Sequence, residues 1–325
     1  MTSGSEFQQG VSVIVVTRDR ADVLESCLDS VIAQSRRPDE IVIVAGCCRS
    51  YPDTLHRKYD SIPIRCLYCD VANISVARNM GLEHASHDVV MFIDDDAVAG
   101  KGWVQSCLLS FEHQKNASMV GGHVIDARSR DGMLEFAFGL IRSDGRQIEV
   151  REEGGASPPG YRRNVKGCNF AINRSRLTQS LQFDEFFRFA FDEADLAYTI
   201  HENGGDVVHE STMIVDHLHA PGAYRSDAPM DRDWHTEFAS HSRFMLKHTR
   251  GLMRLIGWKT ILIRLTVHAA RLMVAILKRQ VAFSQAARYA KGAASGVMYA
   301  VRFGGNGQAF HQQKAQATSS HPRSG

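Results

Sequence analysis

Val11-Ser12-Val13-Ile14-Val15-Val16-Thr17 is a continuous apolar run, which indicates a strand buried on both faces. A helical pattern follows over residues 20–36, with Asp19 as the expected N-cap and Pro38 as the stop. Ile41-Val42-Ile43-Val44-Ala45 then repeats the strand pattern. A strand, a helix and a second buried strand form a β-α-β unit, so the two strands should be parallel.

Further strand patterns over residues 62–68 and 88–93, with a helix over 75–85 between them, complete the first hundred residues. Four strands joined by crossover helices predict an α/β domain with a doubly wound, mostly parallel sheet. In that architecture, ligands bind beyond the carboxyl ends of the strands. The residues at such ends, which we expect to converge on one crevice, are Thr17, Ala45-Gly46 and Asp94 to Asp96.

Three consecutive carboxylates, Asp94-Asp95-Asp96, follow the buried run that ends at Ile93. Acid groups packed this tightly repel one another unless a positive charge sits among them. Oxygen ligands at this density suit Mg²⁺ or Mn²⁺, ions that keep coordination positions open for substrate phosphates. We therefore predict a divalent cation site, with a solvated acidic turn as the alternative.

The second half of the chain is less regular. We predict helices over 102–113 and 193–203, the latter ended by Gly204-Gly205, and strands over 118–125, 165–173, 207–208 and 213–215. Residues 142–163 are rich in Gly, Pro and charge, which indicates a mobile loop or hairpin. Residues 304–325 are polar and are expected to be disordered.

The cysteines give little sign of disulfides or zinc. Seven are present, scattered singly apart from Cys47-Cys48 and Cys66-x-x-Cys69, and this pattern favours a reducing cytosol over a disulfide framework. The single C-x-x-C lacks a second pair or neighbouring histidines, so core packing explains it better than zinc. Residues 1–10 lack the apolar segment of a signal peptide and resemble a flexible leader.

Charge is distributed unevenly along the 325 residues. The net charge is only +2, yet no Asp or Glu occurs after Glu237, whereas residues 238–325 carry 14 Lys and Arg. A basic segment on an acidic body indicates a polyanionic partner, either a membrane or a nucleic acid.

The basic segment contains a helical pattern near its centre. Arg264, Arg271 and Lys278 recur every seven residues with His268 between them, so they share one face of a helix. The other positions are mostly apolar, and Trp258 lies near the start: Leu262, Leu265, Met273, Ile276 and Leu277. This pattern indicates a helix lying in a membrane interface with its basic groups toward anionic head groups, or a helix packed on the body with a solvated basic face.

For this segment we expect neither a membrane-spanning helix nor a nucleic-acid partner. No uncharged apolar run reaches about 18 residues, so we expect no membrane-spanning helix. The segment has few aromatic residues for base stacking, so we expect no nucleic-acid partner.

Five segments, taken in order, resemble family-2 glycosyltransferases, which have the GT-A fold. They are Val11 to Arg20 (opening strand and nucleotide loop), Ser75 to Gly81 ("ARN-x-G" helix start), Phe92 to Asp96 (D-x-D region), Gly167 to Ala171 ("G-x-N-x-A" segment near the acceptor) and Phe183 to Leu196 (catalytic acidic segment). The likeness covers about residues 11–219. The resemblance implies a metal-dependent inverting enzyme that uses a nucleotide-diphosphate sugar.

The resemblance also implies roles on the donor side of the site. Asp96 would bind the metal, Asp94 would contact the ribose or the metal, and Asp95 would lie behind them. Arg78 would pair with a phosphate or hold the carboxylates. One of His217 and His219 would contact the phosphate or the metal, since alternate residues of an extended segment share one face.

Catalysis and acceptor binding are assigned in the same way. An inverting transfer needs a base that takes the proton of the acceptor hydroxyl. Family members usually have Glu-Asp at the catalytic position where this chain has Asp192-Glu193, and Glu193 falls on the base. The alternative is that these acids only cap a helix. Gly167, Asn169 and Asp195 would lie near the acceptor.

One departure from the family concerns the nucleotide. Members often carry acidic residues after the second strand, whereas this chain has Ala45-Gly46-Cys47-Cys48-Arg49-Ser50 there. Recognition of the nucleoside should therefore depend on Thr17, Asp19 and backbone groups.

The expected organisation is a leader (1–10), a GT-A domain (11–225), a basic amphipathic helical region (226–303) and a tail (304–325). Within the GT-A domain we expect a nucleotide-sugar half over about 11–125 and an acceptor half over about 126–225.

The leading hypothesis is transfer of a sugar to a saccharide or lipid-linked saccharide. The enzyme would be cytoplasmic and bound peripherally to the inner face of an anionic membrane through residues 238–303. Alternatives are a sugar nucleotidyltransferase, although the loop Thr17-Arg18-Asp19-Arg20 lacks glycine, and a catalytically silent sugar-nucleotide-binding scaffold.

Overall fold

The chain folds into two compact units. The computed structural model describes residues 9–46, 59, 61–126, 134–136, 138–150, 157–178, 181–220, 233–278 and 282–303. Unit 1 comprises Met1–Arg142, Gln147–Glu185 and Asp192–Ala220, and unit 2 comprises Ser143–Arg146, Phe186–Phe191 and Pro221–Gly325. The predicted tail, 304–325, lies outside the described residues, as do Cys47 to Ser50.

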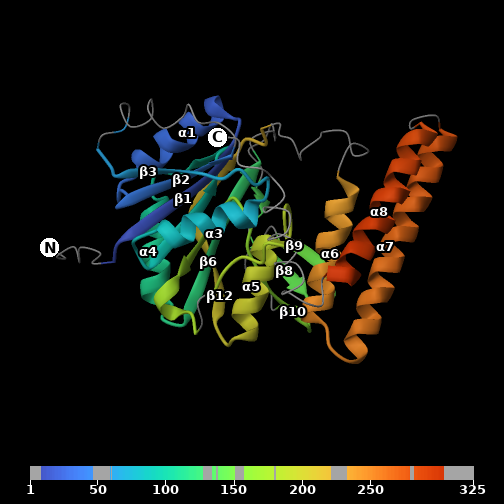
Figure 1. The fold of residues 1–325 in the computed structure, drawn as a ribbon. Helices are drawn as coiled ribbons and strands as arrows, with labels where there is room; N and C mark the ends of the chain where they lie inside the picture. Colours follow the sequence, from blue (N-terminus) through green and yellow to red (C-terminus); the bar gives the residue numbers. More distant parts are fainter. Residues whose placement is uncertain are drawn as a thin grey trace, which may run out of the picture. The chain divides into compact units, whose positions relative to one another are not determined.

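The apolar runs of the first hundred residues form the parallel half of the sheet in unit 1 (Figure 1). β1 (Val11–Arg18) lies between β2 (Glu40–Gly46) and β4 (Val89–Asp94), and β3 (Ile64–Tyr68) extends the sheet beyond β2. All three pairings are parallel, which confirms the predicted β-α-β arrangement. β2 is buried along its whole length, as the continuous apolar pattern requires.

Helices cover both faces of this sheet. α1 (Ala21–Ile32) and α4 (Trp103–His113) pack in one apolar cluster on one face. α3 (Ile74–His84) and α5 (Asp192–Glu202) pack in a second cluster on the other. The doubly wound α/β architecture is therefore confirmed.

The start of α1 differs from the prediction. Asp19 is not the N-cap: it has a positive φ of 54° and is exposed, and α1 begins at Ala21. Arg20 occupies the N-cap position without a side-chain capping hydrogen bond, because a guanidinium has no acceptor for a helix N–H; it is bound to Asp95 instead. The helix also ends at Ile32, earlier than the predicted residue 36.

The second half of the sheet is mixed. β11 (Asn169–Asn173) lies between β4 and β6 (Ala117–Asp126) and is antiparallel to both. β6 pairs in parallel with β12 (Asp206–His217). The short strands β5 (Ala97–Ala99) and β7 (Leu134–Phe136) pair antiparallel with β12 and β6, respectively. The two short strands predicted at 207–208 and 213–215 are one strand, broken by a register shift between Glu210 and Ile214. The predicted strand over 165–173 begins only at Asn169.

Unit 1 also contains a small second sheet. Part of the segment over 142–163, predicted as a loop or hairpin, pairs in a three-stranded antiparallel sheet of β8 (Phe138–Arg142), β9 (Gln147–Val150) and β10 (Tyr161–Asn164). α5 ends before Gly204, whose φ of 81° suits a residue without a side chain. Described cysteines, including Cys66 and Cys69, are free.

The described residues of unit 2 include the helices α6 (Trp234–His248), α7 (Leu252–Leu277) and α8 (Phe283–Phe303). Trp234, Phe238, Leu272 and Tyr289 form the centre of its apolar cluster. Among the described residues, α7 is long and apolar enough to cross a membrane, with a mean hydropathy of 1.7 over an 18-residue window. The sequence-based expectation of no such helix considered only runs without any charged residue, whereas the apolar stretch of α7 includes up to two charged residues.

Asn169 ties the antiparallel strand β11 to its surroundings. Its side chain is fully buried, and its Oδ1 accepts a hydrogen bond of 2.8 Å from Trp103 Nε1. Its Nδ2 donates to the carbonyl oxygens of His123 and Met213, at 2.7 and 2.8 Å. One amide thus joins α4, β6, β11 and β12.

Replacing Asn169 with Ala should therefore lower the free energy of unfolding by about 3 kcal/mol, because three buried groups lose their partner. Chemical denaturation measures this loss. The exposed Asn116 supplies the control: Asn116→Ala should change stability by no more than about 0.5 kcal/mol. Equal effects of the two substitutions would contradict the structural role of Asn169.

Candidate active site

The carboxyl ends of two strands and the start of one helix bring an acidic cluster together in unit 1. Asp94 is the last residue of β4, His217 is the last residue of β12, and Asp192 is the first residue of α5. Leu218 N donates to the Asp96 carbonyl oxygen at 2.8 Å, which joins the ends of the two strands. The ends of these elements therefore bring together residues more than one hundred positions apart in the sequence.

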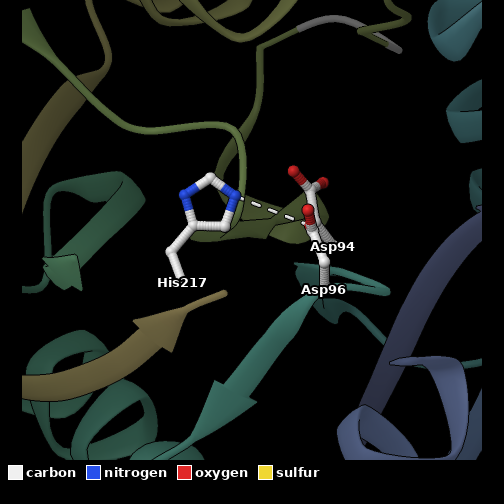
Figure 2. Close-up of side chains that lie close together, drawn as sticks. All are labelled: Asp94, Asp96 and His217. Carbon is white, nitrogen blue, oxygen red and sulfur yellow. Dashed lines mark ion pairs between the residues drawn. The ribbon is translucent and has the colours of Figure 1, made fainter. Parts of the chain in front are cut away.

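Asp94, Asp96 and His217 form a group that could hold a metal ion. Their ligand atoms all lie within 4.8 Å of one another, and Figure 2 shows the three side chains pointing toward one another. His217 Nε2 lies 3.5 Å from Asp96 Oδ1. Asp96 and His217 are both buried. Two carboxylates and one imidazole fit a divalent cation such as Mn²⁺, and small side-chain movements would bring them to bonding distance.

The second predicted histidine lies beside the first. The rings of His217 and His219 have centroids 3.8 Å apart. His219 is not part of the converging group, and its φ of 54° turns the chain at the end of β12. The structure therefore favours His217 as the metal ligand of the pair.

Asp95 points to different partners from its two neighbours. Thr17 Oγ1 donates a hydrogen bond of 2.7 Å to Asp95 Oδ2, and Arg20 forms an ion pair with the same carboxylate. Burial raises the pKa of Asp95 to about 6, while Arg20 and Thr17 counteract the rise. Asp95 thus lies behind the metal group, and the hydroxyl of Thr17, predicted to contact the nucleotide, is bound to it.

Arg20 was missed as a site residue. Its Nη1 lies 3.2 Å from Asp96 Oδ2 and 3.3 Å from the Ala220 carbonyl oxygen. The Ala220 amide in turn donates to Asp96 Oδ2 at 3.0 Å. Arg20 therefore neutralises two buried carboxylates and holds the segment after β12 against them. The only sequence signal was its place in the loop after the first strand.

Arg78 lies at the centre of the cluster and is almost completely buried. Its Nη1 pairs with Asp192, and its Nη2 lies 3.2 Å from Asp94 Oδ1. The same Nη2 donates to the Gly167 carbonyl oxygen at 2.7 Å. Of the two predicted roles of Arg78, phosphate contact and holding the carboxylates, the structure favours the second.

Three aromatic rings surround the guanidinium. The rings of Phe92, Phe170 and Phe183 have centroids 5.4 to 6.0 Å from Arg78 Cζ. Cation–π contact and exclusion of water both strengthen the ion pairs of a buried arginine. The rings thus fix the position of the group that joins Asp94 to Asp192.

Glu193 follows Asp192, the ion-pair partner of Arg78, at the start of α5. It is half-buried, and a side-chain carbon added to Gly167 would lie 3.5 Å from Glu193 Cδ and 3.3 Å from Arg78 Nη2. Burial raises the pKa of Glu193 well above its usual range, and the charge of Asp192 and a hydrogen bond to it add to the rise. A carboxylate with a raised pKa is a stronger base, as proton abstraction near neutral pH requires.

Four further residues were predicted to contact the nucleotide or the acceptor, and they differ in exposure and in contacts. Asp19 is exposed at the end of β1, and Asp195 is buried on the first turn of α5. The amide of Asn169 is engaged within the sheet, so contact with an acceptor would require those hydrogen bonds to break. Gly167 accepts from Arg78 and adjoins Glu193.

Replacing Arg20 with Met should lower the free energy of unfolding by about 3 kcal/mol, because it leaves the Asp95 and Asp96 carboxylates buried without their cation. Adding Asp95→Asn to that variant should restore part of the loss. Denaturant unfolding of both variants tests this. Arg36→Met is the control, since it removes a surface ion pair with Asp39 and should cost about 0.5 kcal/mol. A loss no larger than that of the control would contradict the role of Arg20.

Comparison with known proteins relates this geometry to a family. Residues 12–164 match the model of glycosyl transferase family 2. The chain is 29% identical over 222 residues to the glucosyl-dolichyl phosphate glucuronosyltransferase of Haloferax volcanii, which covers 64% of this chain and 68% of that protein. It is 24% identical over 242 residues to the O-antigen biosynthesis protein RfbC of Myxococcus xanthus, covering 71% of this chain and 19% of that protein.

Solved structures share the fold at low sequence identity. GalNAc-T7, crystallised with UDP, GalNAc and Mn²⁺, superposes with a TM-score of 0.56 at 16% identity, over 73% of this chain and 47% of that chain. S. aureus TarS superposes with a TM-score of 0.50 at 14% identity, over 76% of this chain and 41% of that chain. The chain thus spans less than half the length of either. Together with the motif order and the acidic site, these matches support a family-2 glycosyltransferase with a GT-A-like fold.

Proposed function

We propose that this glycosyltransferase is metal-dependent and inverting, and that it transfers a sugar from a nucleotide-diphosphate sugar to a saccharide or lipid-linked saccharide. One observation carries the proposal. Arg78 binds Asp94 of the metal group with one nitrogen and Asp192, the neighbour of Glu193, with another. A donor-binding group and a candidate base therefore lie on two sides of one buried side chain.

In this proposal Glu193 is the catalytic base. Its carboxylate takes the proton of the acceptor hydroxyl, and the hydroxyl oxygen forms a bond to the anomeric carbon. The bond from that carbon to the diphosphate breaks, and the nucleoside diphosphate leaves with the electron pair. Because the base and the leaving group act on opposite faces of the sugar, the configuration at the anomeric carbon is inverted.

Asp94, Asp96 and His217 would hold the cation. A bound Mg²⁺ or Mn²⁺ supplies a Lewis acid for the charge that grows on the departing diphosphate. The solved GalNAc-T7 structure, which contains Mn²⁺ and UDP, supports this choice of cofactor and donor class. Arg78 and Arg20 form ion pairs with the surrounding carboxylates and hold them in position.

The proposed acceptor and location rest on a relative and on the charge pattern of the chain. The haloarchaeal relative is named for a lipid-linked sugar, glucosyl-dolichyl phosphate, which supports a lipid-linked acceptor. Residues 238–303 contain no acidic residue and include the apolar helix α7. We accordingly place the enzyme in the cytoplasm, bound peripherally to the inner face of an anionic membrane.

The transferase proposal is tested with a panel of nucleotide-diphosphate sugars, by measuring thermal stabilisation with and without Mn²⁺ and then donor turnover. The true donor should raise the melting temperature in proportion to its excess over its dissociation constant. Failure of every donor to bind or turn over would contradict the proposed function.

Metal binding should depend on Asp96. We expect Asp96→Asn to weaken Mn²⁺ binding by at least about 100-fold, beyond the roughly 10- to 100-fold effect of losing a group that only supports a ligand. Titration with Mn²⁺ monitored by electron paramagnetic resonance measures the free ion directly. Glu112→Gln, an exposed change on α4, should leave the affinity unaltered. Wild-type affinity in the Asp96→Asn variant would rule out the assigned site.

Substitution of the base should separate binding from chemistry. Glu193→Gln should keep the affinity for the donor and lower kcat by about 100- to 10,000-fold, because the amide cannot accept the proton. The control is Glu202→Gln at the exposed end of the same helix, which should behave as wild type. Loss of donor affinity with unchanged kcat would contradict the role of Glu193 as base.

The activity of the wild-type enzyme should also fall as the pH drops. The pKa of Glu193 is raised, so the carboxylate becomes protonated at a higher pH than an ordinary glutamate, and only the ionised form accepts a proton. The acidic limb of kcat/KM should therefore have an apparent pKa well above the ordinary 4.5. A limb at the ordinary value would show that another group is the base.

A further inference from the structure

The outward face of α7 is unusually apolar for a surface helix. Of its 26 residues, only Gly257, Ile261 and Leu272 are buried. The most exposed apolar side chains are Leu252 (74%), Leu255 (64%), Leu262 (62%), Met273 (64%) and Leu277 (78%). Contiguous apolar patches of this kind mark contact with another surface. We call these five side chains the outward face.

The opposite side of α7 is fixed by polar and aromatic contacts inside unit 2. Arg264 pairs with Glu237 of α6 and lies over the Phe238 ring, 5.5 Å from its centroid. His268 stacks on Tyr289 of α8 with ring centroids 5.9 Å apart, and its ring lies 5.4 Å from that of Trp234. These contacts set the rotation of α7 about its axis. Two members of the predicted basic stripe, Arg264 and His268, are thus turned inward.

The charges around this face indicate what covers it. Every described Asp or Glu of the chain lies at or before Glu237, so the ionic side chains exposed on α7 and α8 are cationic; they include Lys259, which lies one helical turn from Leu255 and from Leu262, and Arg288 and Lys291 of α8. A second copy of this chain seated on the face would bring like charges together, which costs free energy. Anionic lipid head groups match these cations, and acyl chains match the apolar side chains between them.

We propose that the outward face of α7 inserts among the acyl chains of an anionic bilayer, with the helix lying in the plane of the interface. This rests on the membrane association proposed above and assigns the contact to the apolar face rather than to the basic stripe. α7 does not cross the bilayer in this arrangement. A crossing would carry Glu237 and the other polar groups packed against its inner side into the hydrocarbon, where buried charges are costly.

The first test measures binding of the full chain to vesicles by flotation, with phosphatidylglycerol–phosphatidylcholine vesicles compared with pure phosphatidylcholine. The double variant Leu255→Gln/Leu262→Gln should weaken binding to the anionic vesicles by at least about tenfold. The control is Val71→Gln/Ile148→Gln, which changes two exposed apolar side chains in unit 1 and should bind as wild type. Equal binding of the double variant and the wild type overturns the proposal.

The same double variant tests whether a second copy of the chain, rather than lipid, covers the outward face. If it does, sedimentation of the wild type without lipid will show a dimer that the double variant lacks, and this result also overturns the proposal. Donor turnover in lipid-free solution should be equal in the wild type and the double variant. If neither turns over any donor, the transferase proposal fails, while the vesicle result still decides the lipid contact.

The second test measures depth with a native reporter. Trp258 lies half-buried on α7, whereas Trp103 and Trp234 are buried inside the protein. Lipids brominated near the head-group end of the acyl chain should quench Trp258 more than lipids brominated near the chain terminus, and Trp258→Phe should remove the quenched signal. Stronger quenching from the chain terminus, or no quenching of bound protein, overturns the in-plane arrangement.

Discussion

The site depends on one buried cation, the guanidinium of Arg78, which lies between two carboxylates that belong to different parts of the fold. Asp94 ends a strand of the parallel sheet, and Asp192 begins the helix that carries Glu193. Leaving such carboxylates buried without a cation would cost several kcal/mol, so the pairings hold both elements in place. The planar fork of arginine satisfies both partners and the Gly167 carbonyl at once, which a lysine cannot do.

This arrangement links the two halves of the proposed chemistry. Arg78 leaves the metal-facing atoms of Asp94 close to Asp96 and His217, while its charge lowers the pKa of Glu193 against the larger effect of burial. Arg20 forms ion pairs with Asp95 and Asp96 in the same way. Asp96 also accepts a hydrogen bond from the Ala220 amide, which holds the segment that follows His217. Within the acidic cluster, Asp95 and Asp96 pair with Arg20, and Asp94 and Asp192 pair with Arg78.

Much of this could be predicted from the sequence, because buried parallel strands need continuous apolar runs and strand ends in a doubly wound sheet converge. Asp94, Asp96 and His217, three of the predicted metal-binding candidates, have their ligand atoms within 4.8 Å of one another. Sequence patterns did not reveal that Arg20 turns to Asp95, because the two residues lie 75 positions apart in the sequence. They did not show that Asn169 joins four elements, or that Arg264 turns inward to Glu237, since both depend on contacts between residues distant in the sequence.

The most direct test of the account is the substitution Arg78→Lys, which keeps the charge and removes the fork. Two quantities should be measured on the same folded variant: the affinity for Mn²⁺ and the apparent pKa of the acidic limb of kcat/KM. If one guanidinium positions both the metal group and the base, both quantities will change together. A variant that keeps wild-type Mn²⁺ affinity while its pH profile shifts, or the reverse, would contradict the account by showing that the two groups are positioned independently.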